Sequence, residues 1–221
     1  MDKLDKKQSI IGTQGTKNKN ILTWEYYNSI PKEWESEKVK DMLTEPYYKF
    51  SPMFSSKQCA DILQLADTFE KVPSTVETKG IVDSKIRKST ISWMYQNPKT
   101  DWLYEWLYTS MYNTNYWKFD VRGFFDAIQY TVYTGGKKGD FYNWHTDTGP
   151  GMNHRKISMS ILLSDPKEYT GGDLELERGG RLKLKKGEAV MFPSYMTHKV
   201  HPVTSGVRKS LVVWFVGPPL K

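Results

Sequence analysis

The fold is decided by the stretch from residue 171 to residue 217, GGDLELERGGRLKLKKGEAVMFPSYMTHKVHPVTSGVRKSLVVWFVG. Short apolar runs in this stretch are separated every few residues by glycine or proline, which is typical of strands joined by turns. Strands are expected at residues 173–176, 181–184, 189–192, 198–203 and 209–216. Many short strands with such turns predict an all-β sandwich or jelly roll.

The same pattern extends upstream to residue 124. Two further strands are expected at residues 124–134 and 157–164, and glycine-containing turns at 135–136 and 149–151 bound them. Nearer the N-terminus, a strand is expected in which alternate residues from 87 to 95 share one side, before Asn97 and Pro98 end it.

Two helices are expected before the strand-rich part. Ser55 and Gln58 have the spacing of a capping box, and apolar residues follow at helical intervals from Cys59 to Phe69. The second helix carries Trp102, Leu103, Trp106, Leu107 and Met111, a stripe that we interpret as core rather than as a base-stacking platform.

The chain of 221 residues is long enough for one domain with a small appendage. Residues 1–20 are polar and lysine-rich, so a flexible tail is expected there. The predicted fold of residues 21–221 is a single, mainly β domain with flanking helices. It is a double-stranded β-helix (jelly roll, cupin-like) with N-terminal helices packed on one face. Helical support is expected at 50–115 and the catalytic core at 120–217.

Composition excludes several classes of protein. Aromatic residues make up 14% of the chain, which excludes a wholly disordered or collagen-like chain. Cys59 is the only cysteine, so no intrachain disulfide can form, and we expect a packed rather than catalytic thiol. No apolar run approaches the roughly 20 residues of a membrane span. A soluble, intracellular, cytoplasmic protein without membrane contact is therefore expected.

The segment FYNWHTD, residues 141–147, contains a candidate metal site. On a strand, His145 and Asp147 would share a face and could converge on one ion. Among the four histidines of the chain, His198 is the best third ligand and His201 is the alternative. In an extended segment these two point to opposite sides, so both are not expected to bind. His154 is expected at the surface.

Two histidines and one carboxylate form the facial triad that suits non-haem Fe(II) oxygenases, whose open positions accept a 2-oxo acid and O2. A closed structural zinc site would need thiolates that the chain lacks, and there is no zinc-protease motif. On a strand from residue 208, Arg208 and Ser210 share a face and could clamp one carboxylate. A structural Asp or Glu is the alternative partner for Arg208.

The ordered set of His145, Asp147, His198 and Arg208 resembles the iron(II)/2-oxoglutarate-dependent dioxygenase superfamily. It is more closely similar to the prolyl 4-hydroxylase-like branch, of bacterial or phage type. The flanking segments match as well: 130–133 before 141–145, Gly-Gly-Asp-Leu at 171–174, and 202–208. The similarity covers roughly residues 87–217.

The resemblance implies that His145, Asp147 and His198 bind iron and that Arg208 binds the distal carboxylate of 2-oxoglutarate. It also implies that Tyr133 lines the 2-oxoglutarate pocket, with a packed core tyrosine as the alternative. In some relatives a further tyrosine holds 2-oxoglutarate where this chain has Leu162, with Ser160 beside it. We expect Ser210 to compensate.

The predicted function is that of an Fe(II)- and 2-oxoglutarate-dependent dioxygenase, a prolyl 4-hydroxylase-like hydroxylase, with O2 as co-substrate and ascorbate as an accessory. A peptide or protein substrate is expected, with a small molecule as the alternative. The loops at 137–140 and 148–155 should select it. Arg155 and Lys156 are expected to be solvated, or else to contact an acidic substrate.

Two other functions compete with this prediction. One is a non-catalytic metal-binding jelly-roll module. The other is a basic, nucleic-acid-associated protein, which only the net charge of +7 supports, so nucleic acid is not an expected partner.

Overall fold

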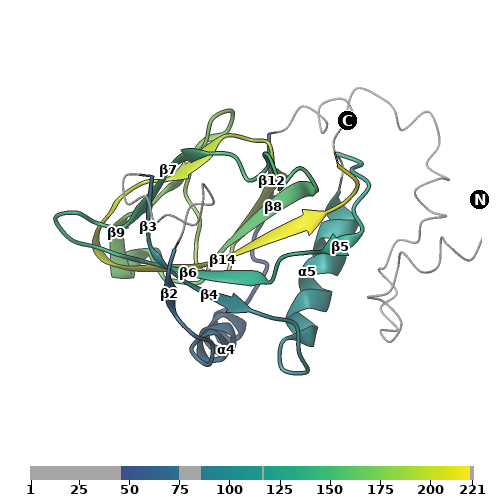
Figure 1. Ribbon diagram of the computed structural model, residues 1–221. Coiled ribbons are helices and arrows are strands. Elements are labelled where there is room, and N and C mark those ends of the chain that lie inside the picture. Colours follow the sequence, from purple (N-terminus) through teal and green to yellow (C-terminus); the bar gives the residue numbers. More distant parts are fainter. Residues whose placement is uncertain (1–45, 75–85, 116, 220–221) are drawn as a thin grey trace, which may run out of the picture.

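Two β-sheets that face each other make up most of the molecule (Figure 1). The structure, a computed structural model, describes residues 46–74, 86–115 and 117–219. The tail expected at residues 1–20 lies outside these ranges. Apolar side chains of both sheets, among them Tyr133, Phe192, Leu176 and Val200, form a core cluster between them.

The larger sheet has nine strands. Their order is β1-β12-β8-β14-β6-β4-β2, with β5 and β9 also paired to β14. The strands are β1 (Tyr48–Phe50), β2 (Val72–Pro73), β4 (Thr90–Met94), β5 (Gly123–Phe124), β6 (Ile128–Thr134), β8 (Arg155–Leu162), β9 (Tyr169–Gly171), β12 (Ala189–Pro193) and β14 (Val203–Val216). Every pairing is antiparallel.

The smaller sheet has five strands in the order β11-β10-β13-β7-β3. They are β3 (Arg87–Lys88), β7 (Phe141–His145), β10 (Leu174–Leu176), β11 (Gly180–Leu182) and β13 (His198–Val200). A short 3-10 helix, η2 (Pro166–Glu168), precedes β9. The mainly β, jelly-roll fold class expected from the sequence is thus confirmed.

The two faces of the larger sheet have different chemistry. On β8, Ile157, Met159 and Ile161 belong to the core cluster that also contains helix residues. The alternate residues Ser158 and Ser160 point the other way and line a cavity between the sheets. Because both faces are covered, all eight residues of β8 are buried. The inner face can therefore carry polar side chains for a site while the outer face supplies the apolar core.

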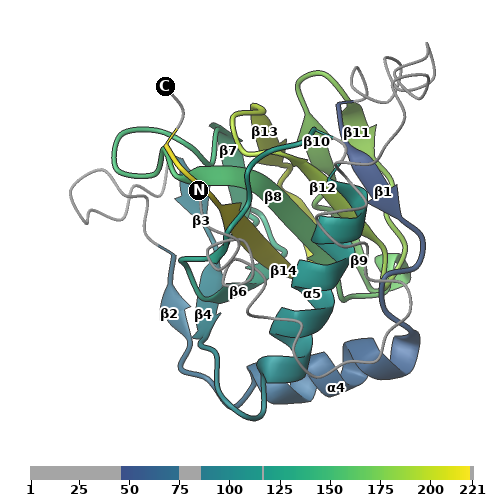
Figure 2. The same ribbon diagram turned by 90° about the vertical axis from the view of Figure 1, so that its right-hand side faces the viewer.

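Helices α4 (Ser56–Ala66) and α5 (Asp101–Thr114) cover the outer face of the larger sheet (Figure 2). Cys59 is fully buried on α4, as expected for a packed thiol. On α5, Leu103, Leu107 and Met111 are also fully buried. Trp102 and Trp106, which we expected in the core, are 38% and 46% exposed, because the buried stripe of α5 runs through Tyr104 and Tyr108 instead.

The single strand expected at residues 87–95 is in fact two short strands in different sheets. β3 pairs with β7 of the smaller sheet, and β4 pairs with β6 of the larger one. The chain crosses between sheets at Ser89, and Tyr95 lies beyond β4 with 65% exposure. Strands within 50–115 are therefore part of both sheets, so this segment is more than helical support. No helix in the described ranges has the length and apolar character that crossing a membrane requires.

The expected capping box at the start of α4 is confirmed. The Gln58 backbone N–H donates to Ser55 Oγ at 3.2 Å, and the Ser55 N–H donates to Gln58 Oε1 at 2.9 Å. Ser55→Ala should therefore lower the free energy of unfolding by about 1 kcal/mol, because it removes the acceptor for a helix N-terminal donor. Urea denaturation measures this. Lys57→Ala, on the exposed side of the same turn, is the control, and an equal loss in both variants would contradict the capping role.

Candidate metal centre

His145 and His198 are direct neighbours across two strands of the smaller sheet. His145 is the last residue of β7, and His198, the first residue of β13, is its pairing partner. Their ring centroids are 4.1 Å apart. Pairing between strands that are far apart in sequence thus brings together two imidazoles separated by 53 positions.

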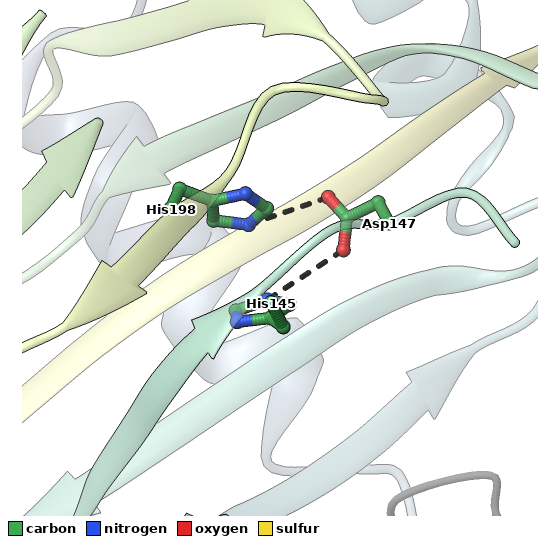
Figure 3. A group of neighbouring side chains, drawn as sticks. All are labelled: His145, Asp147 and His198. Carbon is green, nitrogen blue, oxygen red and sulfur yellow. Dashed lines mark ion pairs between the residues drawn. The ribbon is translucent and has the colours of Figure 1, made fainter. Parts of the chain in front are cut away.

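Asp147 completes the group (Figure 3). It lies beyond the end of β7, so the expectation that it shares a strand face with His145 is wrong. The chain bends after β7, and the Asp147 N–H donates to the carbonyl of Ser194 at 2.9 Å. The hydroxyl of Ser158 donates to Asp147 Oδ2 at 2.6 Å. These two bonds fix the carboxylate beside the histidines.

The hydrogen bonds of the two imidazoles leave one nitrogen of each free for a metal. His145 Nδ1 lies 2.7 Å from the carbonyl of Asn143, and His198 Nδ1 lies 2.8 Å from the carbonyl of Met196. A carbonyl only accepts, so both Nδ1 atoms carry the hydrogen. The Nε2 atoms lie 3.7 Å and 3.5 Å from the two carboxylate oxygens of Asp147.

The ligand atoms of the three residues all lie within 4.8 Å of one another, so one ion could contact all of them. Burial lowers the pKa of His145 to about 3, and the nearby His198 contributes to the same shift. Burial alone would raise the pKa of Asp147, but His198, His145 and the Ser158 hydroxyl lower it below its ordinary value. A neutral imidazole and an ionised carboxylate are the forms that ligate metals, and this donor set fits the facial triad of a non-haem iron site.

Arg208 lines the same cavity and is only 2% exposed. Its Nη1 donates to Ser210 Oγ at 3.0 Å, and its guanidinium carbon lies 5.5 Å from the centre of the Tyr133 ring. No carboxylate within the described ranges forms an ion pair with it, so the alternative of a structural Asp or Glu partner is not realised there. A buried guanidinium without a counter-ion is costly, which favours an anionic ligand in this cavity.

The other two histidines lie elsewhere. The ring of His201, which follows the end of β13, is hydrogen-bonded to the carboxylate of Glu175, and His201 is not among the residues that line the cavity. It is therefore not part of the group, in line with the expected alternation. His154 is half-buried rather than on the surface, with its ring 4.9 Å from that of Phe125.

Arg155 and Lys156, which we expected to be solvated, are buried. Arg155 Nε donates to Asp126 Oδ2 at 2.9 Å, and its guanidinium lies 4.0 Å from the centre of the Trp214 ring. The sequence expectation failed because the carboxylate partner is 29 positions away. The Arg155–Asp126 pair and Trp214 all line the cavity.

Arg87 is a second residue whose place in the cavity the sequence analysis missed. It is 7% exposed and donates to Gln129 Oε1 at 2.6 Å. It also lies 4.6 Å from the centre of the Tyr142 ring, which in turn stacks on His145 at 3.4 Å. One sign in the sequence indicated that Arg87 is buried: alternation in the expected strand placed it on the same side as apolar residues.

Gly172 of the Gly-Gly-Asp-Leu motif packs directly against the side chain of Arg208. Its φ is +67°, and a Cβ atom there would lie 2.9 Å from Arg208 Cδ and 2.8 Å from Val203 Cγ2. The glycine therefore provides both the left-handed backbone and the space for the arginine stem.

Gly172→Ala should weaken binding of a carboxylate ligand at Arg208, because the methyl group displaces the guanidinium and strains the backbone. We expect roughly tenfold weaker 2-oxoglutarate binding, the equivalent of about 1.4 kcal/mol, in calorimetric titration. Gly151→Ala also has a positive φ, of +82°, but open space around its Cβ, so it controls for backbone strain alone. Equal effects of both substitutions on affinity would contradict the role of close approach.

Comparison with known proteins agrees with this geometry. Residues 128–216 match the sequence model of the 2OG-Fe(II) oxygenase superfamily. A PKHD-type hydroxylase from Synechococcus sp. (strain CC9902) is 40% identical over 81 residues, which are 34% of this chain and 36% of the relative. The chain thus spans about a third of the length of this curated relative.

Solved structures share the fold. A prolyl-4-hydroxylase from Pseudomonas putida superposes with a TM-score of 0.63 at 20% identity, covering 80% of this chain and 96% of the other. A Trichoplax adhaerens prolyl hydroxylase, solved with a hypoxia inducible factor oxygen degradation domain peptide fragment, gives 0.62 at 15% identity over 84% and 94%. Residues 128–216 are therefore similar to the 2OG-Fe(II) oxygenase superfamily, and the fold is that of the solved prolyl hydroxylases.

Proposed function

We propose that this protein is an Fe(II)- and 2-oxoglutarate-dependent dioxygenase that hydroxylates its substrate. One observation carries the proposal. The His145, Asp147 and His198 group opens into the same cavity as Arg208, a buried cation without a carboxylate partner among the described residues. A metal site and an anion site in one cavity are what a chelating 2-oxo dicarboxylate requires.

In this proposal, the Nε2 atoms of both histidines and a carboxylate oxygen of Asp147 hold iron(II). When bound, the iron supplies the redox chemistry that couples oxidative decarboxylation of 2-oxoglutarate by O2 to substrate hydroxylation. The residues of the chain orient the reactants. The Ser158 hydroxyl holds Asp147, and the backbone carbonyls of Asn143 and Met196 keep the imidazoles in the metal-binding tautomer.

Arg208 is assigned to the distal carboxylate of 2-oxoglutarate through a charge-assisted pair. Ser210 orients its guanidinium through the hydrogen bond at 3.0 Å. Tyr133, 2% exposed, forms the neighbouring wall of the cavity. Ser160 also lines this cavity, whereas Leu162 lines a second one behind Arg208. Ser210, which lines the same cavity as Arg208, is the residue proposed to compensate for the leucine at position 162.

The proposed substrate is a peptide or protein, because a structural relative was solved with a peptide fragment. The part of the cavity that Trp214 and the Arg155–Asp126 pair line would receive it. A small-molecule substrate is the other outcome to test. Ascorbate as an accessory, a cytoplasmic location and a single domain over residues 21–221 with a tail at 1–20 remain predictions.

The test is incubation of the purified protein with Fe(II), 2-oxoglutarate and O2, with succinate measured as product. Stimulation of succinate formation by a proline-containing peptide library, with a mass gain of one oxygen in the peptide, would support a peptide hydroxylase. Stimulation by free amino acids alone would favour a small molecule. Tight iron binding without succinate formation would instead favour the non-catalytic metal-binding module.

A further inference from the structure

Arg208 borders two cavities. One side of the residue lines the cavity that contains the metal-binding group. The other side lines a second cavity, bounded also by Leu162, Tyr169, Gly172 and Lys183. Because Arg208 borders both cavities, a neighbouring group must determine on which side the guanidinium lies.

Ser210 alone provides weak restraint. It accepts one hydrogen bond from Nη1, while a guanidinium has five N–H donors. No carboxylate in the described ranges draws Arg208 to either side. At the position facing the second cavity, β8 presents the apolar side chain of Leu162, which offers no acceptor.

Tyr169 supplies the missing contact. Strand β9 pairs with β14, and this pairing places Tyr169 opposite Gly206, two residues before Arg208. Both side chains pack over Gly172, since a Cβ there would lie 2.9 Å from Arg208 Cδ and 3.4 Å from Tyr169 Cε2. Burial raises the pKa of Tyr169, while the charge of Arg208 and a hydrogen bond from its guanidinium act in the opposite direction.

We propose that Tyr169 is a positioning residue for Arg208. Its phenolic oxygen accepts a hydrogen bond from the guanidinium, and its ring closes the approach to the second cavity. Together they keep the cation at a fixed distance from the metal-binding group. This inference rests on the proposed function, because the distance between Arg208 and the metal-binding residues is proposed to match the length of 2-oxoglutarate.

Tyr169 should also determine which length of co-substrate fits. With Tyr169 removed, the guanidinium can withdraw into the second cavity, so the carboxylate receptor moves away from the metal. A 2-oxo dicarboxylate with one more methylene, 2-oxoadipate, should then fit better relative to 2-oxoglutarate. General loosening of the fold would weaken both ligands alike and would not change their order.

The experiment is calorimetric titration of 2-oxoglutarate and 2-oxoadipate into anaerobic, Fe(II)-loaded protein. Tyr169→Phe keeps the ring and loses the acceptor, so its dissociation constant for 2-oxoglutarate should rise about tenfold. Tyr169→Ala also opens the cavity, so the preference for 2-oxoglutarate over 2-oxoadipate should fall at least about fivefold. Tyr95→Phe, at a tyrosine that is 65% exposed, is the matched control and should bind both ligands like the wild type.

Unchanged 2-oxoglutarate affinity in Tyr169→Phe would overturn the inference, as would a fixed chain-length preference in Tyr169→Ala. Thermal melting checks that each variant is folded. If Tyr169→Ala does not fold, the affinity of Tyr169→Phe decides alone. If the wild type itself binds no 2-oxoglutarate, the proposed function fails, and this outcome is separate from a wild type that binds normally beside an unaffected variant.

Discussion

Asp147→Ala is expected to abolish iron-dependent turnover of 2-oxoglutarate. The substitution removes the only carboxylate of the metal-binding group and leaves two neutral imidazoles. Loss of a group that merely supports a metal ligand costs about 10–100-fold in affinity, so loss of a ligand itself should cost more. Iron affinity, measured by competition with a chelator, and succinate formation should both fall, the latter below detection. His145→Ala and His198→Ala should behave alike.

The matched control is His201→Ala. His201 lies three positions from His198 on the same segment, but it binds Glu175 and does not line the cavity. This variant should keep most of its turnover and its full iron content. An active His198→Ala beside an inactive His201→Ala would mean that the third ligand was wrongly assigned. Stoichiometric iron and full turnover in His145→Ala would contradict the whole group.

Arg208→Ala is expected to raise the 2-oxoglutarate requirement by roughly 30-fold or more, while iron binding without co-substrate stays nearly unchanged. Removing one partner of a buried charge pair costs roughly 2–5 kcal/mol, much of it from leaving the other charge unpaired. Titration of 2-oxoglutarate into the iron-loaded variant measures the effect. Arg208→Lys should retain part of the affinity, because the charge remains but the planar fork is lost.

An unchanged affinity in Arg208→Ala would place the distal carboxylate elsewhere. Arg87 would then be the first residue to test, because it is buried in the same cavity and its hydrogen bonds go to the neutral acceptors Ser89 and Gln129. Arg155 is a poorer candidate, because Asp126 already neutralises it. Substituting each of the three arginines in turn therefore shows which of them binds the distal carboxylate.

Local patterns in the sequence identified most of the fold. The capping box at Ser55 is present as expected, and the strands expected after residue 124 have counterparts within a few residues. Boundaries that depend on tertiary structure were less accurate. The strand expected at 124–134 is divided into β5 and β6, and β14 begins already at Val203. Pairing partners, rather than local propensity, determine where these strands begin and end.

The sequence also grouped His145, Asp147 and His198, which the structure places together, because the chain has only four histidines; that they bind a metal stays a prediction. It did not identify the residues that complete the cavity. Arg155 and Asp126 are 29 positions apart, and Arg87 and Gln129 are 42 apart. The local sequence around a charged residue does not reveal a partner that is distant in sequence and comes close only in the folded protein. The contact between Tyr169 and Arg208 was not predicted for the same reason.

Strand β14 pairs with β5, β6, β8 and β9, and it also carries Arg208 and Ser210. A substitution in this strand would thus affect both the assembly of the sheet and the proposed binding of the co-substrate. The loop at residues 148–154 pairs with no strand, but its residue Met152 lines the cavity. Under the proposed function, substrate preference could therefore change through substitutions in this loop, while β14 and the proposed co-substrate site remain as they are.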